Sequence, residues 1–352
     1  MKIDKDFVGG NIEVVKIEDA EIYLKNELRD TSIDWFYWAF CVEGAEGRTL
    51  TFHLDKKWIG YYGPAVSNDL KNWKWLGSKD ETCISDTFTY TFRNDENKVY
   101  FAHNMLYLPD RFRDFCRRQK LDIKTLCTSG EGEVPYVTLG IGEEIMIISS
   151  RHHACESTGT YVLEGLLEEL NREQIPGLQV ICVPFVDYDG VVNGDQGKSR
   201  IPWDHNRDYG LEEDPIYPVT KTLRQLAKDN RVRYAFDFHS PWHAGKMNDR
   251  EFIIRKDYGV EISQFAILLE ESITSNSLPY VSADVMPPNV DWNQEKTPSF
   301  ARYMKQHGAE LSFTLETPYF NINGVPFSAE RGVEMGRCFA RALRSYHKSH
   351  HN

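Results

Sequence analysis

Residues 145–161 read Ile145-Met-Ile-Ile-Ser-Ser-Arg-His-His-Ala-Cys-Glu-Ser-Thr-Gly-Thr-Tyr161, and the rest of the chain is organised around them. An apolar run typical of a strand ends in a group of His and Glu side chains, and a helical pattern follows directly. His153 and Glu156 stand three residues apart. At a strand end or in a first helical turn, this spacing lets an imidazole and a carboxylate converge on one metal ion. The alternative is a polar pair at the rim of a loop.

Length and composition describe a globular chain with a sizeable hydrophobic core. Of its 352 residues, 41% are hydrophobic and 13% aromatic, which suits one large domain or two ordinary ones. No stretch reaches the roughly 18 apolar residues of a membrane span. The first residues, Met1–Phe7, lack the apolar segment of a signal peptide. We therefore expect a cytoplasmic protein that does not bind membranes.

Charge and cysteine content narrow the range of partners. The net charge of −12 argues against binding to nucleic acid or anionic membranes, so peptides and small molecules remain. The seven cysteines are scattered along the chain and form no Cys-x-x-Cys pair. This pattern favours reduced thiols over a disulfide framework. The sequence leaves the oligomeric state open.

Residues 1–112 predict a small antiparallel β-sandwich domain. They contain short aromatic and β-branched runs separated by turn residues, as strands of a sandwich do. The sequence predicts strands over 35–42, 47–54, 88–92 and 98–103. We expect the last two to pair as a hairpin across the turn residues 93–97.

Residues 113–352 predict a second domain, in which strands alternate with helices. This alternation indicates an α/β fold, with a mixed, largely parallel sheet flanked by helices. In such sheets, ligands bind at the carboxyl ends of the strands. The expected strands are 134–139, 144–149, 178–185, 234–238 and 310–315, and the main expected helices are 158–171, 218–230, 261–275, 300–307 and 329–348.

Polar side chains follow three of these strands at their carboxyl ends. His153 and Glu156 come after the strand at 144–149, His239 after 234–238 and Glu316 after 310–315. Two histidines and a glutamate leave a fourth position on zinc for water, as catalytic zinc sites do. Glu316 is then the expected general base, since a carboxylate beside such a water can take its proton and pass it to a leaving amine. The alternative for Glu316 is a strand-end salt bridge.

A long Gly-rich loop at 187–209 adds cations and amides, and long loops in compact domains are often functional. The guanidinium of Arg207 can bind a carboxylate with two parallel hydrogen bonds, and the amide of Asn206 can complete the clamp. Asp204 can accept the free N–H of a ligand histidine and fix its tautomer. Taken alone, the loop also fits a surface segment with ordinary ion pairs.

With these residues together, the chain resembles the zinc metallocarboxypeptidases of the carboxypeptidase A-like superfamily. Within them it is most similar to the cytosolic carboxypeptidases, in a bacterial-type form, and the aromatic sandwich is typical of that branch. Five motifs match in order over about 135–320. They are His153-Ala-Cys-Glu156 for HxxE, Asp189-Gly-Val-Val-Asn-Gly194 for DGVxNG, Asp204-His-Asn-Arg207 for DxNR, Asp237-Phe-His239 for the third ligand and Thr314-Leu-Glu316 for TLE.

The resemblance implies a carboxypeptidase-like catalytic domain with one Zn²⁺ per chain, held by His153, Glu156 and His239. It implies Glu316 as general base and acid, and Asn206 with Arg207 as the clamp on the terminal carboxylate of the substrate. The expected activity is removal of one C-terminal residue at a time from peptide or protein tails. Some relatives remove glutamate, so glutamate is a candidate.

The chain departs from the family pattern at several points. The family places an Arg between DGVxNG and DxNR to polarise the scissile carbonyl, whereas here Lys198 or Arg200 has to serve and neither aligns cleanly. The HPGE form of the first motif is His-Ala-Cys-Glu here. The basic residue of the specificity pocket in the glutamate-trimming branch has one candidate, Arg302. A substrate-capping Tyr has no assigned position.

Two other functions remain open at this stage. Relatives with the same ligand pattern act as amidohydrolases on small acyl-amino acids. Alternatively, the chain is an inactive scaffold that binds peptide tails through its aromatic sandwich. The intact set of His153, Glu156, His239 and Glu316 argues against the scaffold, and the sandwich with the DxNR clamp favours a peptide substrate.

Overall fold

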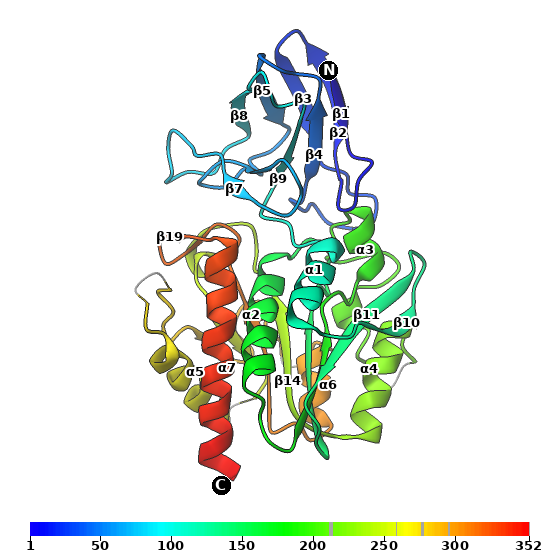
Figure 1. Ribbon diagram of the computed structural model, residues 1–352, viewed down its shortest axis with the longest axis vertical. Coiled ribbons are helices and arrows are strands. Elements are labelled where there is room, and N and C mark those ends of the chain that lie inside the picture. Colours follow the sequence, from blue (N-terminus) through cyan, green and yellow to red (C-terminus); the bar gives the residue numbers. More distant parts are fainter. Residues whose placement is uncertain (211–213, 258, 276–277, 295, 352) are drawn as a thin grey trace.

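The computed structural model describes residues 1–351 apart from 211–213, 258, 276–277 and 295. A β-rich part built from the first hundred residues lies on top of a larger α/β part (Figure 1). The β-rich part has two sheets, ordered β1-β4-β9-β6-β7 and β2-β3-β5-β8. Its pairs are antiparallel except β3 with β5. The strands are β1 Lys2–Asp4, β2 Glu13–Glu18, β3 Glu21–Lys25, β4 Ala39–Glu43, β5 Thr49–Leu54, β6 Ala65–Ser67, β7 Lys74–Trp75, β8 Thr87–Thr91 and β9 Lys98–Ala102.

The predicted hairpin over 88–92 and 98–103 is wrong. Strand β8 pairs with β5, whereas β9 pairs with β4 and β6 in the other sheet. The reason lies in the core, because Phe88 and Phe101 face one another across the two sheets with ring centroids 5.4 Å apart. The connecting turn is fixed by the buried Glu96, which accepts hydrogen bonds from Arg93 N and Tyr90 Oη. Aromatic packing between sheets thus decides the pairing.

The α/β part contains one eight-stranded sheet, ordered β10-β11-β13-β12-β14-β17-β15-β16. Its four central strands β13, β12, β14 and β17 run parallel, and β11 and β15 join them antiparallel. The predicted fold class is therefore confirmed. The strands are β10 Lys124–Thr128, β11 Glu133–Leu139, β12 Glu144–Ser150, β13 Leu178–Val183, β14 Arg231–His239, β15 Phe252–Arg255, β16 Val285–Met286 and β17 Leu311–Glu316. A separate small hairpin follows, formed by β18 Asn321–Ile322 and β19 Val325–Pro326.

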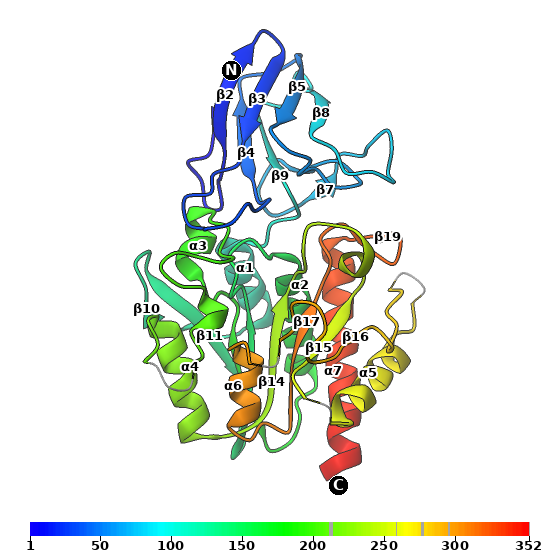
Figure 2. The same cartoon turned by 180° about the vertical axis from the view of Figure 1, so that it is seen from behind.

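Helices cover both faces of this sheet. Helices α1, α2, α5 and α7 pack on one face, and α4 and α6 on the other, as the two views show (Figures 1 and 2). Along β12, Met146 and Ile148 enter the first core, while Ile145 and Ile147 enter the second. A strand covered on both faces has to be apolar throughout, which explains the continuous run in the sequence. The helices are α1 Pro109–Gln119, α2 Thr158–Arg172, α3 Tyr188–Asn193, α4 Pro218–Asp229, α5 Glu261–Ser272, α6 Phe300–Gln306 and α7 Ala329–His351.

Helix α1 spans the expected boundary between residues 112 and 113, so the division into two domains stays a prediction. The seven cysteines are all free thiols, in line with the expected reduced state. Within the described residues, no helix is long and apolar enough to cross a membrane.

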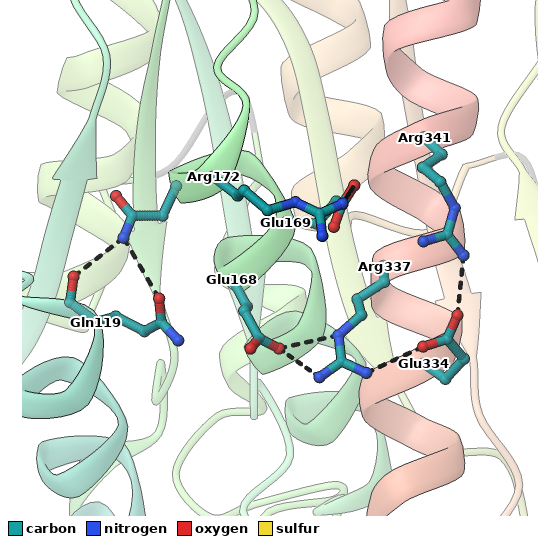
Figure 3. A pocket seen from close by; sticks show the side chains of 8 residues that line it. Gln119, Glu168, Glu169, Arg172, Glu334, Arg337 and Arg341 are labelled. Carbon is teal, nitrogen blue, oxygen red and sulfur yellow. Dashed lines mark hydrogen bonds and ion pairs between the residues drawn. The ribbon is translucent and has the colours of Figure 1, made fainter.

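A surface hollow of about 600 Å³ lies among α1, α2 and α7 (Figure 3). Its charges are paired with one another, since Arg337 contacts Glu168 at 2.7 Å and Glu334 at 3.0 Å. None of the predicted site residues lines this hollow. We interpret this hollow as the site of an ion-pair network between the helices.

Candidate metal centre and catalytic site

The strand ends bring the predicted site residues together. His153 and Glu156 lie in the connection from β12 to α2, while His239 and Glu316 are the last residues of β14 and β17. These two strands are parallel neighbours, and their register places His239 directly beside Glu316. Strand β12 pairs with the other side of β14. The topology thus explains why residues distant in sequence meet at one sheet edge.

Two imidazole rings converge on one carboxylate. His153 Nδ1 lies 2.7 Å from Glu156 Oε1, and His239 Nδ1 lies 2.6 Å from Glu156 Oε2. One donor atom from each of the three residues lies within 4.8 Å of the others. Each residue is 2% exposed. Nitrogen and oxygen donors in this arrangement form a set that Zn²⁺ accepts.

The second nitrogen of each ring faces a further carboxylate. His153 Nε2 lies 3.3 Å from Asp204 Oδ1, and His239 Nε2 lies 2.6 Å from Asp237 Oδ2. Metal-ligating histidines almost always have such a partner, which fixes the tautomer and ring orientation. The arrangement therefore fits a metal ion on the Nδ1 side of both rings.

Asp204 was predicted for this position and Asp237 was not. The sequence does contain a signal for Asp237. It precedes His239 by two residues, and residues two apart on a strand point to the same face of the sheet. Asp204 is held in place by two backbone groups: its carboxylate accepts hydrogen bonds from Asn206 N at 2.8 Å and Ser199 N at 3.0 Å.

Opposite charges govern the ionisation of these groups. Burial alone would raise the pKa of Glu156, but the neighbouring His153 and His239 hold that pKa below its ordinary value. Burial likewise opposes ionisation of Asp204, yet the contact with His153 keeps the pKa of its carboxyl well below the usual range. Both carboxylates are therefore ionised at neutral pH.

Glu316 is in a different environment. It is 5% exposed, and its Oε2 has no hydrogen-bond partner among the described residues. Burial raises the pKa of Glu316 to about 7, although His239 partly offsets the rise. A carboxyl group with a pKa near neutrality suits general acid–base chemistry.

The predicted clamp residues lie beside the metal ligands. Asn206 Nδ2 is 3.2 Å from His239 Nε2, and Asn206 Oδ1 accepts a hydrogen bond from Phe300 N, which ties the amide to the start of α6. Arg207 donates to the carbonyl oxygens of Asn206 at 3.3 Å and Pro298 at 3.2 Å. The guanidinium is half-buried at the edge of the site.

Sequence reasoning missed one cation, Lys256, at the end of β15. Its ammonium donates a hydrogen bond of 2.9 Å to Asn293 Oδ1. Burial, together with the charges of Arg207 and Arg302, lowers the pKa of Lys256 to about 8, and Glu316 is near enough to act in the opposite direction. The charges of Arg207 and Arg302, and that of Glu316, thus act on the Lys256 ammonium. Such a group of cations favours a bound anion.

The two candidates for polarising the scissile carbonyl differ in their surroundings. The guanidinium of Arg200 contacts Asp187 at 2.9 Å and Asp195 at 2.7 Å, so it is occupied by carboxylates. Lys198 is half-buried, 5.9 Å from the ring centroid of Trp35, and its charge lowers the pKa of Glu316. Of the two, Lys198 is the candidate whose charge acts on Glu316.

The chain is similar to known proteins in both sequence and fold. Residues 3–103 match the family model of the cytosolic carboxypeptidase N-terminal domain. The chain is 26% identical over 263 residues to an uncharacterized protein of Zymomonas mobilis, a match that covers 68% of this chain and 67% of that protein. It is also 26% identical over 210 residues to cytosolic carboxypeptidase 2 of Xenopus tropicalis, covering 51% of this chain. The match spans about a fifth of that relative's length, 21%.

Solved structures share the fold over the whole chain. The metallo-carboxypeptidase of Burkholderia cenocepacia superposes with a TM-score of 0.79 at 19% identity, covering 99% of both chains. The metallo-carboxypeptidase of Pseudomonas aeruginosa, in complex with (2-guanidinoethylmercapto)succinic acid, gives a TM-score of 0.76 at 20% identity, covering 98% of both chains.

The N-terminal part of the chain thus matches the cytosolic carboxypeptidase N-terminal domain family. The chain as a whole has the fold of bacterial metallo-carboxypeptidases. The side chains of His153, Glu156 and His239 could hold a metal ion.

Proposed function

We propose that the chain is a zinc-dependent carboxypeptidase that removes a C-terminal glutamate from peptide or protein tails. The observation that carries the proposal is the convergence of two imidazole nitrogens on the Glu156 carboxylate, beside the buried Glu316. Coordination by two histidines and one glutamate leaves zinc an open position for chemistry. We also propose a cytoplasmic setting, in line with the free thiols.

In this proposal, His153, Glu156 and His239 hold the zinc. The ion would supply a Lewis acid and a water with a pKa of about 7. Glu316 would accept a proton from the attacking water as the water adds to the scissile carbonyl, and would deliver it to the leaving amine as the C–N bond breaks. The ammonium of Lys198 stabilises the charge that develops on the scissile carbonyl oxygen.

In this proposal, positively charged side chains determine which C-terminal residue binds. The guanidinium of Arg207 and the amide of Asn206 bind the terminal α-carboxylate. Lys256 and Arg302 then bind the side-chain carboxylate of the same residue. A C-terminal glutamate brings two negative charges to three positive ones. Its side-chain carboxylate would stabilise the Lys256 ammonium, whose pKa is lowered first by burial and then by the charges of Arg207 and Arg302.

A peptide panel tests the proposal. Zinc-loaded protein is incubated with peptides that differ in their last residue (Glu, Gln, Leu or Arg), and mass spectrometry measures which residue is released. We expect glutamate release that a chelator abolishes and zinc restores. Cleavage of acyl-amino acids without peptide trimming would favour the amidohydrolase function. A protein with no metal and no turnover would favour the peptide-binding scaffold.

The variant Lys256→Met isolates the proposed contact with the substrate side chain. It should raise KM for the Glu peptide about tenfold or more while leaving KM for the Gln peptide nearly unchanged, because a charge-assisted hydrogen bond is lost only in the first case. Lys221→Met, on the exposed face of α4 Pro218–Asp229, is the matched control. Equal effects on the Glu and Gln peptides would contradict the assignment.

A further inference from the structure

A chain of four buried side chains extends from the metal site into the protein. Tyr209 Oη lies 2.9 Å from His152 Nε2, and His152 Nδ1 lies 2.8 Å from Asp237 Oδ1. The other oxygen of Asp237 lies 2.6 Å from His239 Nε2. Each of the four is at most 2% exposed. The metal ligand set accounts for His239, but it does not account for His152 or Tyr209.

Hydrogen-bonding capacity fixes where the protons of this chain are. The Asp237 carboxylate can only accept, so His152 Nδ1 and His239 Nε2 both donate to it. A neutral His152 that donates from Nδ1 has to accept at Nε2, and the hydroxyl of Tyr209 is its donor. With its proton on Nε2, His239 would offer the lone pair of Nδ1 to the proposed metal ion, on the side where Glu156 Oε2 lies 2.6 Å away.

Two further contacts make the arrangement rigid. Ser149 Oγ donates to Asp237 Oδ1 at 2.9 Å, so this carboxylate receives three donors. The rings of His152 and His239 are nearly parallel, with an interplanar angle of 10° and centroids 5.8 Å apart. Asp237 therefore has little freedom to rotate away from His239.

We propose that His152 and Tyr209 are positioning residues of the metal centre. They orient Asp237, and Asp237 in turn holds the His239 ring in the tautomer and plane that metal binding requires. This inference rests on the proposed function, because it assumes that His239 ligates the metal. It adds two residues to those that decide metal affinity. His152 is adjacent in sequence to the proposed ligand His153, and Tyr209 lies in the connection after the 3₁₀ helix His205–Arg207.

The same residues offer an alternative that the experiment has to separate. His152, Asp237 and His239 by themselves form a second set of possible metal ligands within 4.8 Å. However, Tyr209 and Ser149 donate into this set, and the donors and acceptors of its members are matched to one another. The hydrogen bonds among Tyr209, His152, Asp237 and Ser149 satisfy these groups without a second ion.

Zinc affinity, measured by competition with a chromophoric chelator, tests the relay without reference to turnover. Tyr209→Phe removes only the hydroxyl and should weaken zinc binding several-fold. His152→Phe should weaken it about tenfold or more, within the range that loss of outer-shell partners produces. Tyr303→Phe is the matched control, since Tyr303 packs 5.9 Å from Tyr209 and its hydroxyl has no partner among the described residues.

Spectra of the cobalt-substituted protein provide a second readout, because the visible bands of Co²⁺ should shift in Tyr209→Phe and stay unchanged in Tyr303→Phe. Equal zinc affinities and unchanged spectra in all variants would overturn the relay and leave the proposed function intact. Two zinc ions per wild-type chain, reduced to one by His152→Phe, would overturn it in favour of a second metal site. A wild-type chain that binds no zinc would overturn the proposed function and the relay together. Weakened zinc binding without glutamate release would support the relay and contradict the proposed substrate.

Discussion

Glu316 combines a buried carboxyl, an oxygen without a hydrogen-bond partner among the described residues and a position beside His239. A general base works only when deprotonated, and burial raises the pKa of Glu316 to about 7. Activity should therefore fall as the pH decreases through this value, about tenfold in kcat/KM per pH unit. A bound dication favours the carboxylate and moves this limb to or below pH 7.

Glu316→Gln is the corresponding variant. It keeps the shape of the side chain and removes the base, so we expect kcat to fall by about 10²–10⁴-fold while zinc stays bound. The measurement is kcat against pH together with the zinc content of both proteins. An unchanged kcat would show that another group takes the proton.

Lys198 and Arg200 should separate into a catalytic and a structural role. Lys198→Met should lower kcat about 100-fold and leave the melting temperature nearly unchanged. Arg200→Met leaves the buried Asp187 without its arginine partner and leaves Asp195 with Arg29 alone, so the free energy of unfolding should fall by about 3–5 kcal/mol. Urea denaturation and steady-state kinetics on both variants check this. The opposite pattern would assign carbonyl polarisation to Arg200.

At the level of single elements, the junction between β15 and β17 contains an unusual carboxyl group. Glu251 is fully buried directly before β15, and its Oε1 accepts a hydrogen bond of 2.8 Å from Thr317 Oγ1. Burial raises the pKa of Glu251 to about 8. A folded-state pKa above the unfolded value of about 4.3 gives stability that is present below pH 4 and lost as the pH rises towards 8.

Glu251→Gln should therefore stabilise the protein at pH 7 by about 1–3 kcal/mol and have little effect at pH 4.5. The amide can keep the contact with Thr317 and has no proton to lose. Urea unfolding of both proteins at the two pH values measures the difference. A destabilised variant at pH 7 would mean that Glu251 is ionised in the folded protein.

The elements also show what the sequence could and could not predict. Strands β12, β14 and β17 were predictable because strands covered on both faces are apolar throughout, and the strand ends then pointed to His153, His239 and Glu316. The partners of β8 and β9 were not predictable from the sequence, because contacts between the two sheets decide them. Lys256 was missed because β15 is only four residues long and runs antiparallel to β17, so that its amino end, and not the carboxyl end that carries Lys256, lies beside Glu316.

At the level of the whole molecule, the β-rich part holds a loop of the site. Asp30 accepts hydrogen bonds from Gln196 N at 3.0 Å and Gly197 N at 2.8 Å. Gly197 has a φ of +77°, and a Cβ at this position would lie 2.0 Å from Ala154 N. The loop that carries Lys198 is therefore fixed between the first part of the chain and the backbone next to His153.

Asp30→Ala should release this loop. We expect kcat/KM to fall about tenfold or more, because small displacements of catalytic groups are costly, while zinc remains bound. Asp34→Ala is the matched control, since Asp34 is half-exposed on the same segment and pairs with Lys56 at the surface. Equal kinetics for the two variants would show that the β-rich part does not support the site.

The central claim is that His153, Glu156 and His239 together hold one metal ion. The most direct test is the amount of zinc that remains bound per folded chain after gel filtration, compared between the wild-type protein and His239→Ala. We predict one zinc per wild-type chain and none in the variant. Undiminished zinc in His239→Ala, or none in the wild type, would contradict this account.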